Sequence, residues 1–370
     1  MTRPTLRRTL KLERLETRQV LSSMGTTPDQ QYALELINLT RTNPSAAAER
    51  FSSHLSADVK ATLAQYNLAA DSLKSKLGSA TPMPALAFND ALAATAQAQS
   101  QYEADNGVQT HIGANGANLS TRLSNAGYSG FNSAGENTYA YAQSVDEAMQ
   151  SFLYDWGVAD DGHYANLLQP GTGAPNAYNE VGVGLVQTNG KGVGPLVVTQ
   201  DFGNNPNTGP QILGVVFNDN NHDHFYAQGE GLGGATIDAV NLTTGKDYQV
   251  QSWQSGGYQV PVDPNADYKV TATINGQVVQ TSKVHVGGTN QKVDFVLDGT
   301  QAPTAPVVVA TPTPAPAPAP KPAPDPAPAP TPTSARLDVS AWAKSQVDQA
   351  APAPSPVAGW ASWNAPVEGN

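Results

Sequence analysis

A long run of alternating prolines limits how much of this chain can fold into a core. Residues 302–333 read APTAPVVVATPTPAPAPAPKPAPDPAPAPTPT. Proline fixes φ and removes a backbone donor, so this stretch favours an extended polyproline spacer over a packed structure. The sequence after it is rich in Ala, Pro and Ser and too short for a core of its own. We therefore expect a Pro-rich linker over residues 299–334, a low-complexity tail over 335–370, and folded domains only before them.

Charge and composition exclude several classes of function. The formal net charge is -11, which argues against a nucleic-acid partner, because such binding needs clustered Lys and Arg. The chain has no cysteine, so neither a disulfide framework nor a thiolate metal site can form. No apolar run reaches the roughly 18 residues that a membrane helix needs, and the sequence predicts no transmembrane segment.

The first 25 residues are basic, whereas the rest of the chain is acidic. They lack the apolar region of a standard signal peptide, and their leucines also fit a basic amphipathic helix. However, LERLETRQVLS (residues 12–22) resembles the short LEPR-type leader found at the start of many extracellular bacterial proteins. That resemblance implies export, so the expected location is secreted, extracellular or at the cell surface.

Residues 26–209 show helical patterns first and strand patterns afterwards, which predicts an α+β domain. Asp29 can cap a helix over YALELINLTR, which an Asn-Pro pair ends. Asn89 can cap an Ala-rich helix, DALAATAQAQSQYEADN, that the following glycine stops. Ser144 begins a capping-box pattern for VDEAMQSFLYDW.

Strand patterns follow these helices and continue into a second region. Residues 180–188 and 194–202 alternate apolar residues and read as an antiparallel hairpin. Residues 210–298 contain short strand-like runs separated by Gly, Asn or Asp turns at a spacing near ten residues. This spacing predicts a small all-β sandwich.

Four polar residues of the first region form a candidate site: His111, Glu136, Asp155 and His163. We expect Glu136 to lie in a Gly-rich loop, and Asp155 near the end of the third helix. Any one of the four could be an ordinary hydrogen-bonded residue. Together they would suit one divalent metal, or acid/base work on a bound water.

The order of motifs in this region resembles the CAP superfamily, which includes cysteine-rich secretory proteins, antigen 5 and plant pathogenesis-related proteins, in its bacterial SCP-like branch. The similar segments are LINLTRTNP, PALAFNDALAATAQAQSQYEADNGVQTH, AGENTYAY, GHYANLL, NEVGVGLV and VVTQDFG. They span nearly all of residues 26–209. The resemblance implies a three-layer α-β-α sandwich.

The resemblance also implies a cleft lined by two histidines and two acidic residues. Three positions carry over directly: His111, Glu136 and His163. Asp155 takes the place of the usual Glu, and Phe152 that of the usual Trp, so Asp160 or Asp161 could serve instead. The cysteines of many eukaryotic members are absent, which favours the bacterial branch.

Several activities are compatible with such a cleft. His111 and His163 could bind a divalent metal, with zinc one candidate, and a metal-bound water would serve hydrolysis. The chain shows no activated nucleophile of the Cys or G-x-S-x-G kind. The alternatives are a non-catalytic cleft for an extracellular lipid, peptide or cell-wall component, and a structural or adhesive surface protein in which the fold is only a scaffold.

The second region opens with an acidic loop, FNDNNHDHFYAQGEGLGG (217–234). Five of its residues occupy ligand positions 1, 3, 5, 7 and 12 of an EF-hand-type calcium loop: Asp219, Asn221, Asp223, the Phe225 carbonyl and Glu230. His224 stands where that loop normally needs Gly. The segment resembles the opening of B-type repeats of bacterial surface adhesins, which implies a prealbumin-like, calcium-binding β-sandwich. The alternative is an Asn/Asp-rich turn without an ion.

Overall fold

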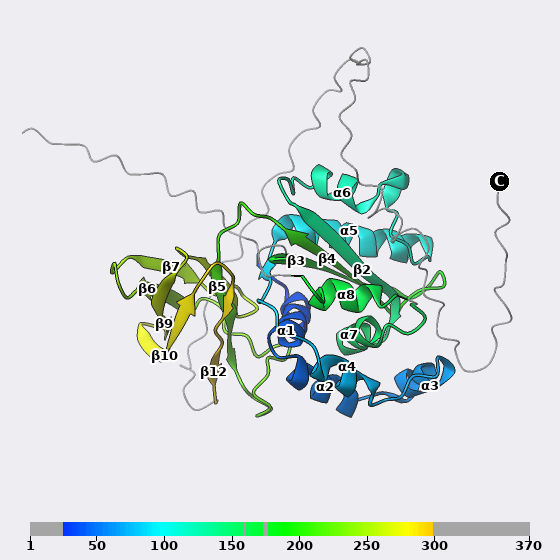
Figure 1. Ribbon diagram of the computed structural model, residues 1–370, viewed down its shortest axis with the longest axis horizontal. Coiled ribbons are helices and arrows are strands. Elements are labelled where there is room, and N and C mark those ends of the chain that lie inside the picture. The colour runs from blue at the N-terminus through cyan, green and yellow to red at the C-terminus, as the bar shows by residue number, and fades with distance from the viewer. Residues whose placement is uncertain (1–24, 159, 173–176, 299–370) are drawn as a thin grey trace, which may run out of the picture.

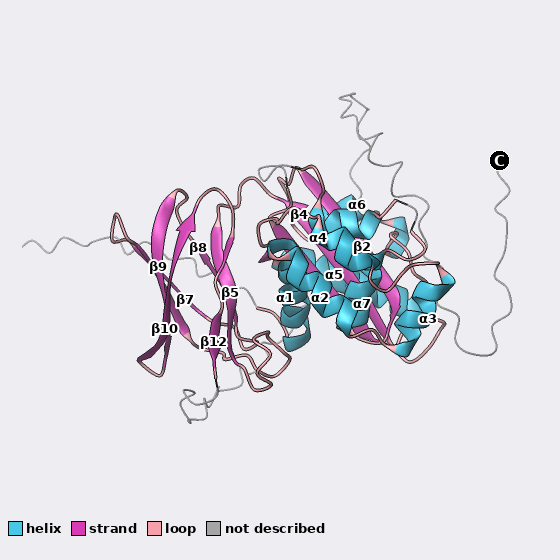
Figure 2. Ribbon diagram, turned by 60° about the horizontal axis from the view of Figure 1, so that its bottom comes forward, coloured by secondary structure: helices cyan, strands magenta, loops and turns pink. Residues whose placement is uncertain are grey.

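A computed structural model describes residues 25–158, 160–172 and 177–298. The expected leader over residues 1–25, the linker over 299–334 and the tail over 335–370 lie outside the described residues, apart from Gly25. The described chain forms two units side by side, one mixed and one all-β (Figures 1 and 2). The α+β class and the C-terminal β region predicted from the sequence are confirmed.

The mixed unit is built on a four-stranded sheet in the order β1-β3-β4-β2. Its strands are β1 (Ala87–Phe88), β2 (Ser133–Ala142), β3 (Glu180–Gln187) and β4 (Leu196–Asn204). β4 pairs antiparallel with β2 and β3, as the predicted hairpin requires, while β1 pairs parallel with β3. β1 and β2 were not expected. The burial of β2 and its pairing with β4, which is regular from Ser133 to Tyr139, place Glu136 in a sheet, which corrects the prediction of a Gly-rich loop.

Helices cover both faces of this sheet (Figure 1). On one face lie α5 (Asp90–Asn106) and α6 (Leu119–Asn125), with a short 3₁₀ turn, η1 (Ala114–Gly116), between them. The remaining helices lie on the other side: α1 (Pro28–Thr42), α2 (Pro44–Ser53), α3 (Ala57–Gln65), α4 (Ser72–Gly78), α7 (Val145–Tyr154) and α8 (Gly162–Leu168). The result is an α-β-α arrangement with the sheet in the middle.

The helix boundaries follow local capping chemistry. Asn89 accepts from the backbone N–H groups of the first turn of α5, and Gly107 ends that helix with φ 68°, as the sequence predicts. Ser144 likewise caps α7. The cap of α1 is Thr27 rather than Asp29, because Thr27 and Gln30 form a reciprocal capping box. Asp29 instead lies in the first turn, where its charge complements the helix dipole.

A fully buried arginine of α1 connects this helix to α8 and to the segments that lead into β1 and β3. Arg41 donates from Nε to the carbonyl of Pro84, and from its other nitrogens to the carbonyls of Leu167 and Tyr178. Burial lowers the pKa of Arg41 to about 9. Because Leu167 lies in the last turn of α8, the guanidinium also satisfies a carbonyl that the helix leaves free.

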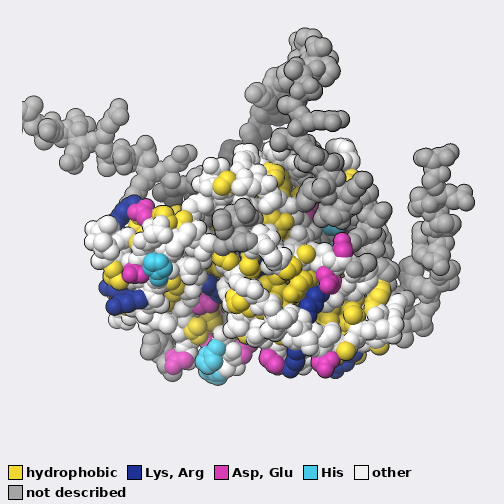
Figure 3. Space-filling view, in the orientation of Figure 1, with side chains coloured by type: hydrophobic (Ala, Val, Ile, Leu, Met, Phe, Trp, Pro, Cys, Tyr) yellow, Lys and Arg dark blue, Asp and Glu magenta, His cyan; other side chains and the backbone are white. Residues whose placement is uncertain are grey.

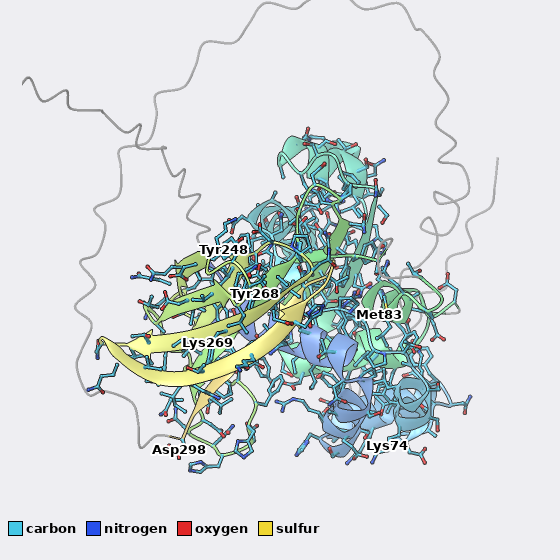
Figure 4. All side chains as sticks on the ribbon, turned by 60° about the vertical axis from the view of Figure 1, so that its left-hand side comes forward. Lys74, Met83, Tyr248, Tyr268, Lys269 and Asp298 are labelled. Atoms are coloured by element: carbon cyan, nitrogen blue, oxygen red, sulfur yellow. The ribbon has the colours of Figure 1, made fainter. Side chains whose placement is uncertain are left out.

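The all-β unit is a sandwich of two sheets, with strand order β10-β9-β6-β7 in one and β11-β5-β12 in the other, where β8 also pairs with β5. Its strands are β5 (Gln211–Asn218), β6 (Thr236–Asn241), β7 (Asp247–Gln251), β8 (Gly257–Pro261), β9 (Ala266–Ile274), β10 (Gln277–Val286), β11 (Gln291–Lys292) and β12 (Phe295–Leu297). Tyr248 and Tyr268 lie in this sandwich, whereas Met83 and Lys74 lie in the helical unit (Figure 4).

The two units share a buried interface. On β8, the amide of Gln259 accepts from the N–H of Phe88 at 3.0 Å and donates to its carbonyl at 2.9 Å, which covers the edge strand β1. Lys292 is paired with Glu35 of α1 at 2.7 Å and also with Asp294. Because the buried core of the first unit includes Val215, Phe217 and Tyr226 of the second, apolar packing runs across the boundary.

None of the helices in the described ranges is long and apolar enough to cross a membrane.

Candidate functional site

His111 and Glu136 form the first half of the site. His111 follows the left-handed end of α5, and its Nδ1 lies 2.8 Å from Oε1 of Glu136. Burial alone would lower the pKa of His111, but the hydrogen bond and charge of Glu136 raise it. Burial alone would raise the pKa of Glu136, but His111 and Arg122 lower it. Glu136 is therefore an ionised acceptor, and Nδ1 of His111 is its donor.

Arg122 of α6 completes this half, and the sequence analysis missed it. Its guanidinium contacts the second carboxylate oxygen of Glu136. Its other nitrogen donates to the carbonyl of His111 at 2.8 Å. Arg122 thus fixes both members of the pair. It lies in a short helix that Asn118 caps, and its only sequence signal was a basic residue in an otherwise uncharged segment.

Asp155 and His163 form the second half. Oδ1 of Asp155 lies 2.6 Å from Nδ1 of His163, and its Oδ2 accepts from the N–H of Tyr164 at 3.0 Å. Asp155 is buried, and it ends α7 with φ 57°. Glycine is the usual residue for that backbone, so an Asp there costs about 1 kcal/mol of strain that its two hydrogen bonds must offset. Asp161, one of the two alternative carboxylates, pairs instead with Lys76.

The two pairs approach β2 from opposite helical layers. Neighbouring residues of a strand point to opposite faces, so Glu136 faces α5 and α6 while Asn137 faces α7 and α8. Asn137 donates to the carbonyl of His163 at 3.2 Å, and Asn166 donates to the carbonyl of Glu136 and to the amide oxygen of Asn137. The four predicted residues therefore lie around residues 136–137 of one edge strand, as two separate pairs.

The pairs differ from the single cluster of four ligands that the sequence suggested. Within the described ranges, no group of three or more His, Cys, Asp or Glu side chains could hold a metal ion. Instead, each imidazole uses Nδ1 on a carboxylate, which leaves Nε2 as its free nitrogen. The side chains of His111 and His163 are 21% and 11% exposed, so both remain within reach of solvent.

The acidic loop of the second unit is tightly folded. Asp219 accepts from the N–H groups of Asp223 and His224, each at 3.1 Å. Glu230 accepts from those of Asn220 and Ala227. His224 has φ 58°, so it adopts the left-handed turn for which a calcium loop normally uses Gly. Acidic and histidine side chains gather at the lower edge of the molecule, below β12 (Figure 3).

Comparison with protein families decides the nature of the first unit. Residues 34–202 match the sequence profile of CAP, the cysteine-rich secretory protein family. Residues 34–202 form a CAP domain. The match includes all four candidate residues, so both pairs belong to this domain. The predicted CAP domain is confirmed, while the likeness of the second unit to B-type repeats and that of the leader stay predictions.

Solved structures that are similar to part of this chain were also found. One is an extracellular protein containing an SCP domain from Bacillus anthracis, 23% identical over 41% of this chain and 45% of that protein, with a TM-score of 0.27. Another is an outer surface protein from Borrelia burgdorferi, 16% identical over 40% of this chain and 92% of that protein, also with a TM-score of 0.27. The chain thus spans less than half the length of the Bacillus protein. Comparison with curated proteins gave no match.

Proposed function

We propose that the chain is an exported CAP-domain protein whose cleft binds a divalent metal through Nε2 of His111 and His163. The observation that supports this most is the carboxylate behind each imidazole. A neutral histidine that donates Nδ1–H to a carboxylate presents a lone pair at Nε2, and metal-binding histidines commonly have such a partner. In this proposal Glu136 and Asp155 orient the two ligands and are not ligands themselves.

Two imidazoles, each backed by a carboxylate, supply the donor chemistry that zinc prefers. A bound zinc ion would supply an acidified water for hydrolysis. Neither pair contains a side-chain nucleophile, so the chain's own residues would contribute only binding and orientation. We therefore propose metal or ligand binding as the primary role, with hydrolysis as an additional activity of the loaded protein. The ligand would be an extracellular lipid, peptide or cell-wall component.

Zinc titration of the full chain by calorimetry tests the proposal. Wild-type protein should bind zinc, and His111→Ala and His163→Ala should each remove that binding. His285→Ala is the matched control, because His285 also places Nδ1 near a carboxylate, Asp267, at 2.7 Å but on an exposed surface. Zinc binding that survives the loss of both cleft histidines would refute the site.

A second proposal concerns the acidic loop, for which the φ of His224 is the favourable observation. We propose that calcium draws Asp219, Asn221, Asp223, the Phe225 carbonyl and Glu230 together as its ligands, since their acidic side chains do not form a metal-holding group in the described structure. An ion that binds only the folded state stabilises it, so millimolar calcium should raise the melting temperature, and Asp219→Asn should abolish the gain. An equal gain in wild type and variant would place any calcium elsewhere.

The alternative role is a surface scaffold, and the buried interface between the two units favours it. The edge strand β1 of the CAP sheet is covered by the β-sandwich, and an ion pair between the largely buried Lys292 and the buried Glu35 crosses the boundary. Such an interface would hold the CAP domain at a fixed orientation. If zinc does not bind and the cleft variants keep wild-type stability, this role is the better description of the chain.

A further inference from the structure

A third carboxyl group lies beneath the His111–Glu136 pair. Asp201 of β4 is directly opposite Glu136 of β2 in the register of the sheet. Asp201 is 0% exposed and Glu136 is 2% exposed. Side chains directly opposite on antiparallel strands lie on the same face about 5 Å apart at Cβ. Two buried carboxyl groups therefore face each other across one strand boundary.

In the described residues no cation makes a hydrogen bond to Asp201: Nε of Arg122 has no partner, and the charge of Arg122 opposes the rise in the pKa of Asp201 without reversing it. The guanidinium of Arg122 contacts Glu136 and the carbonyls of His111 and Ala117. Nδ1 of His111 is used on Glu136. Within the described part of the chain, neither oxygen of Asp201 has a hydrogen-bond donor nearby. An ionised carboxylate in that position would be both desolvated and repelled by Glu136.

The other neighbours do not change this balance. On the far side of β4, the residue opposite Asp201 is Gly182, which has no side chain to offer. In the helix above, Glu103 uses its two oxygens to accept from the N–H of Thr110 and the hydroxyl of Thr138. Glu103 thus adds a further acidic group, and no further donor, to the surroundings of the pair.

We infer that Asp201 carries a proton at neutral pH and donates it in a hydrogen bond to Glu136. Asp201 is then a positioning residue: together with Arg122 it holds Glu136 in place as the anion that orients His111. Burial, followed by the charge of Glu136, raises the pKa of Asp201 well above its usual range, which agrees with this geometry. The inference does not require a bound metal, and it can be tested independently of the proposed zinc site.

Infrared spectroscopy of the full chain labelled with [4-13C]aspartate tests the protonation state directly. At pH 7 the wild-type protein should show the carbonyl band of a protonated Asp, and Asp201→Asn should lack it. A wild-type spectrum with only ionised aspartates at pH 7 would overturn the inference. If Asp201→Asn does not fold, Glu136→Gln decides: it should shift the band, and a band that stays in place belongs to another residue and refutes the assignment.

Paired variants separate a donated hydrogen bond from simple filling of space. Asn can donate to Glu136 from the position of Asp201, whereas Leu has a similar volume and no donor. At pH 7 we expect Asp201→Leu to melt about 5 °C or more below Asp201→Asn. Equal melting temperatures for the two variants would show that no donor is needed there.

Discussion

Glu103 offers a quantitative test of how the buried acids of the CAP domain affect stability. It is fully buried in α5 and accepts hydrogen bonds from Thr110 and Thr138. Burial raises the pKa of Glu103 from 4.5 to about 7. The folded protein therefore binds this proton more tightly than the unfolded chain, so stability is lost as the pH rises from about 4.5 to about 7.

The size of the effect follows from the shift. Each pKa unit corresponds to 1.36 kcal/mol, so the ionised side chain should cost up to about 3 kcal/mol of unfolding free energy at pH 8 relative to pH 4. Glu103→Gln removes the titration and keeps both contacts, because its oxygen can accept from Thr110 and its amide can donate to the hydroxyl of Thr138. The variant should therefore gain stability relative to wild type as the pH rises.

Urea unfolding of wild type and Glu103→Gln at pH 4.5 and pH 8 measures how the stability of the variant relative to wild type changes with pH. Glu49→Gln is the control, because it makes the same change at a side chain that is 70% exposed. We expect its free energy of unfolding to change between the two pH values by about as much as that of wild type. If Glu103→Gln loses the same stability at both pH values, Glu103 is ionised throughout and acts only as a hydrogen-bond acceptor, and the reasoning fails.

Two further predictions concern the interface and the second half of the site. Burial alone would lower the pKa of Lys292, but Asp294 and Glu35 raise it. Lys292→Met should leave the buried Glu35 and the one-third exposed Asp294 without their cation and cost about 3–5 kcal/mol in urea unfolding. Adding Glu35→Gln should recover part of that loss, and no recovery would contradict a direct pair. Asp155→Asn keeps an acceptor for the N–H of Tyr164 but loses the charge behind His163, so calorimetry should show weaker zinc binding with only a small change in melting temperature. Asp155→Gly relieves the left-handed backbone and should weaken zinc binding at least as much. Unchanged zinc affinity in both variants would contradict an orienting role for Asp155.

Much of the fold could be predicted because its signals are local. Asn89 and Gly107 mark both ends of α5, and the apolar alternation of residues 180–202 marks two paired strands. The short helices α2, α3, α4, α6 and α8 went unpredicted, since each is ten residues or fewer and gains its stability from packing. Most residues of β10 are exposed or only partly buried, so its apolar alternation is confined to Val284 and Val286 at the end of the strand.

The site was predicted in its residues and not in its arrangement. His111, Glu136, Asp155 and His163 were found through motifs, but a motif does not show which atoms meet. The pairing of His111 with Glu136, and of His163 with Asp155, depends on which face of β2 each residue occupies. Arg122 and Asp201 come from other elements, and only the register of the sheet and the packing of α6 bring them to Glu136.

The GEN sequence at 135–137 is explained by the position of these residues on an edge strand between two helical layers. A Cβ on Gly135 would lie 2.6 Å from the amide oxygen of Asn166, so the glycine lets α8 approach the strand closely. Glu136 then points to the α5 and α6 layer and anchors His111, while Asn137 points to the α7 and α8 layer and binds the backbone of His163. Three consecutive residues therefore fix both halves of the site, because strand alternation sends one polar side chain to each face.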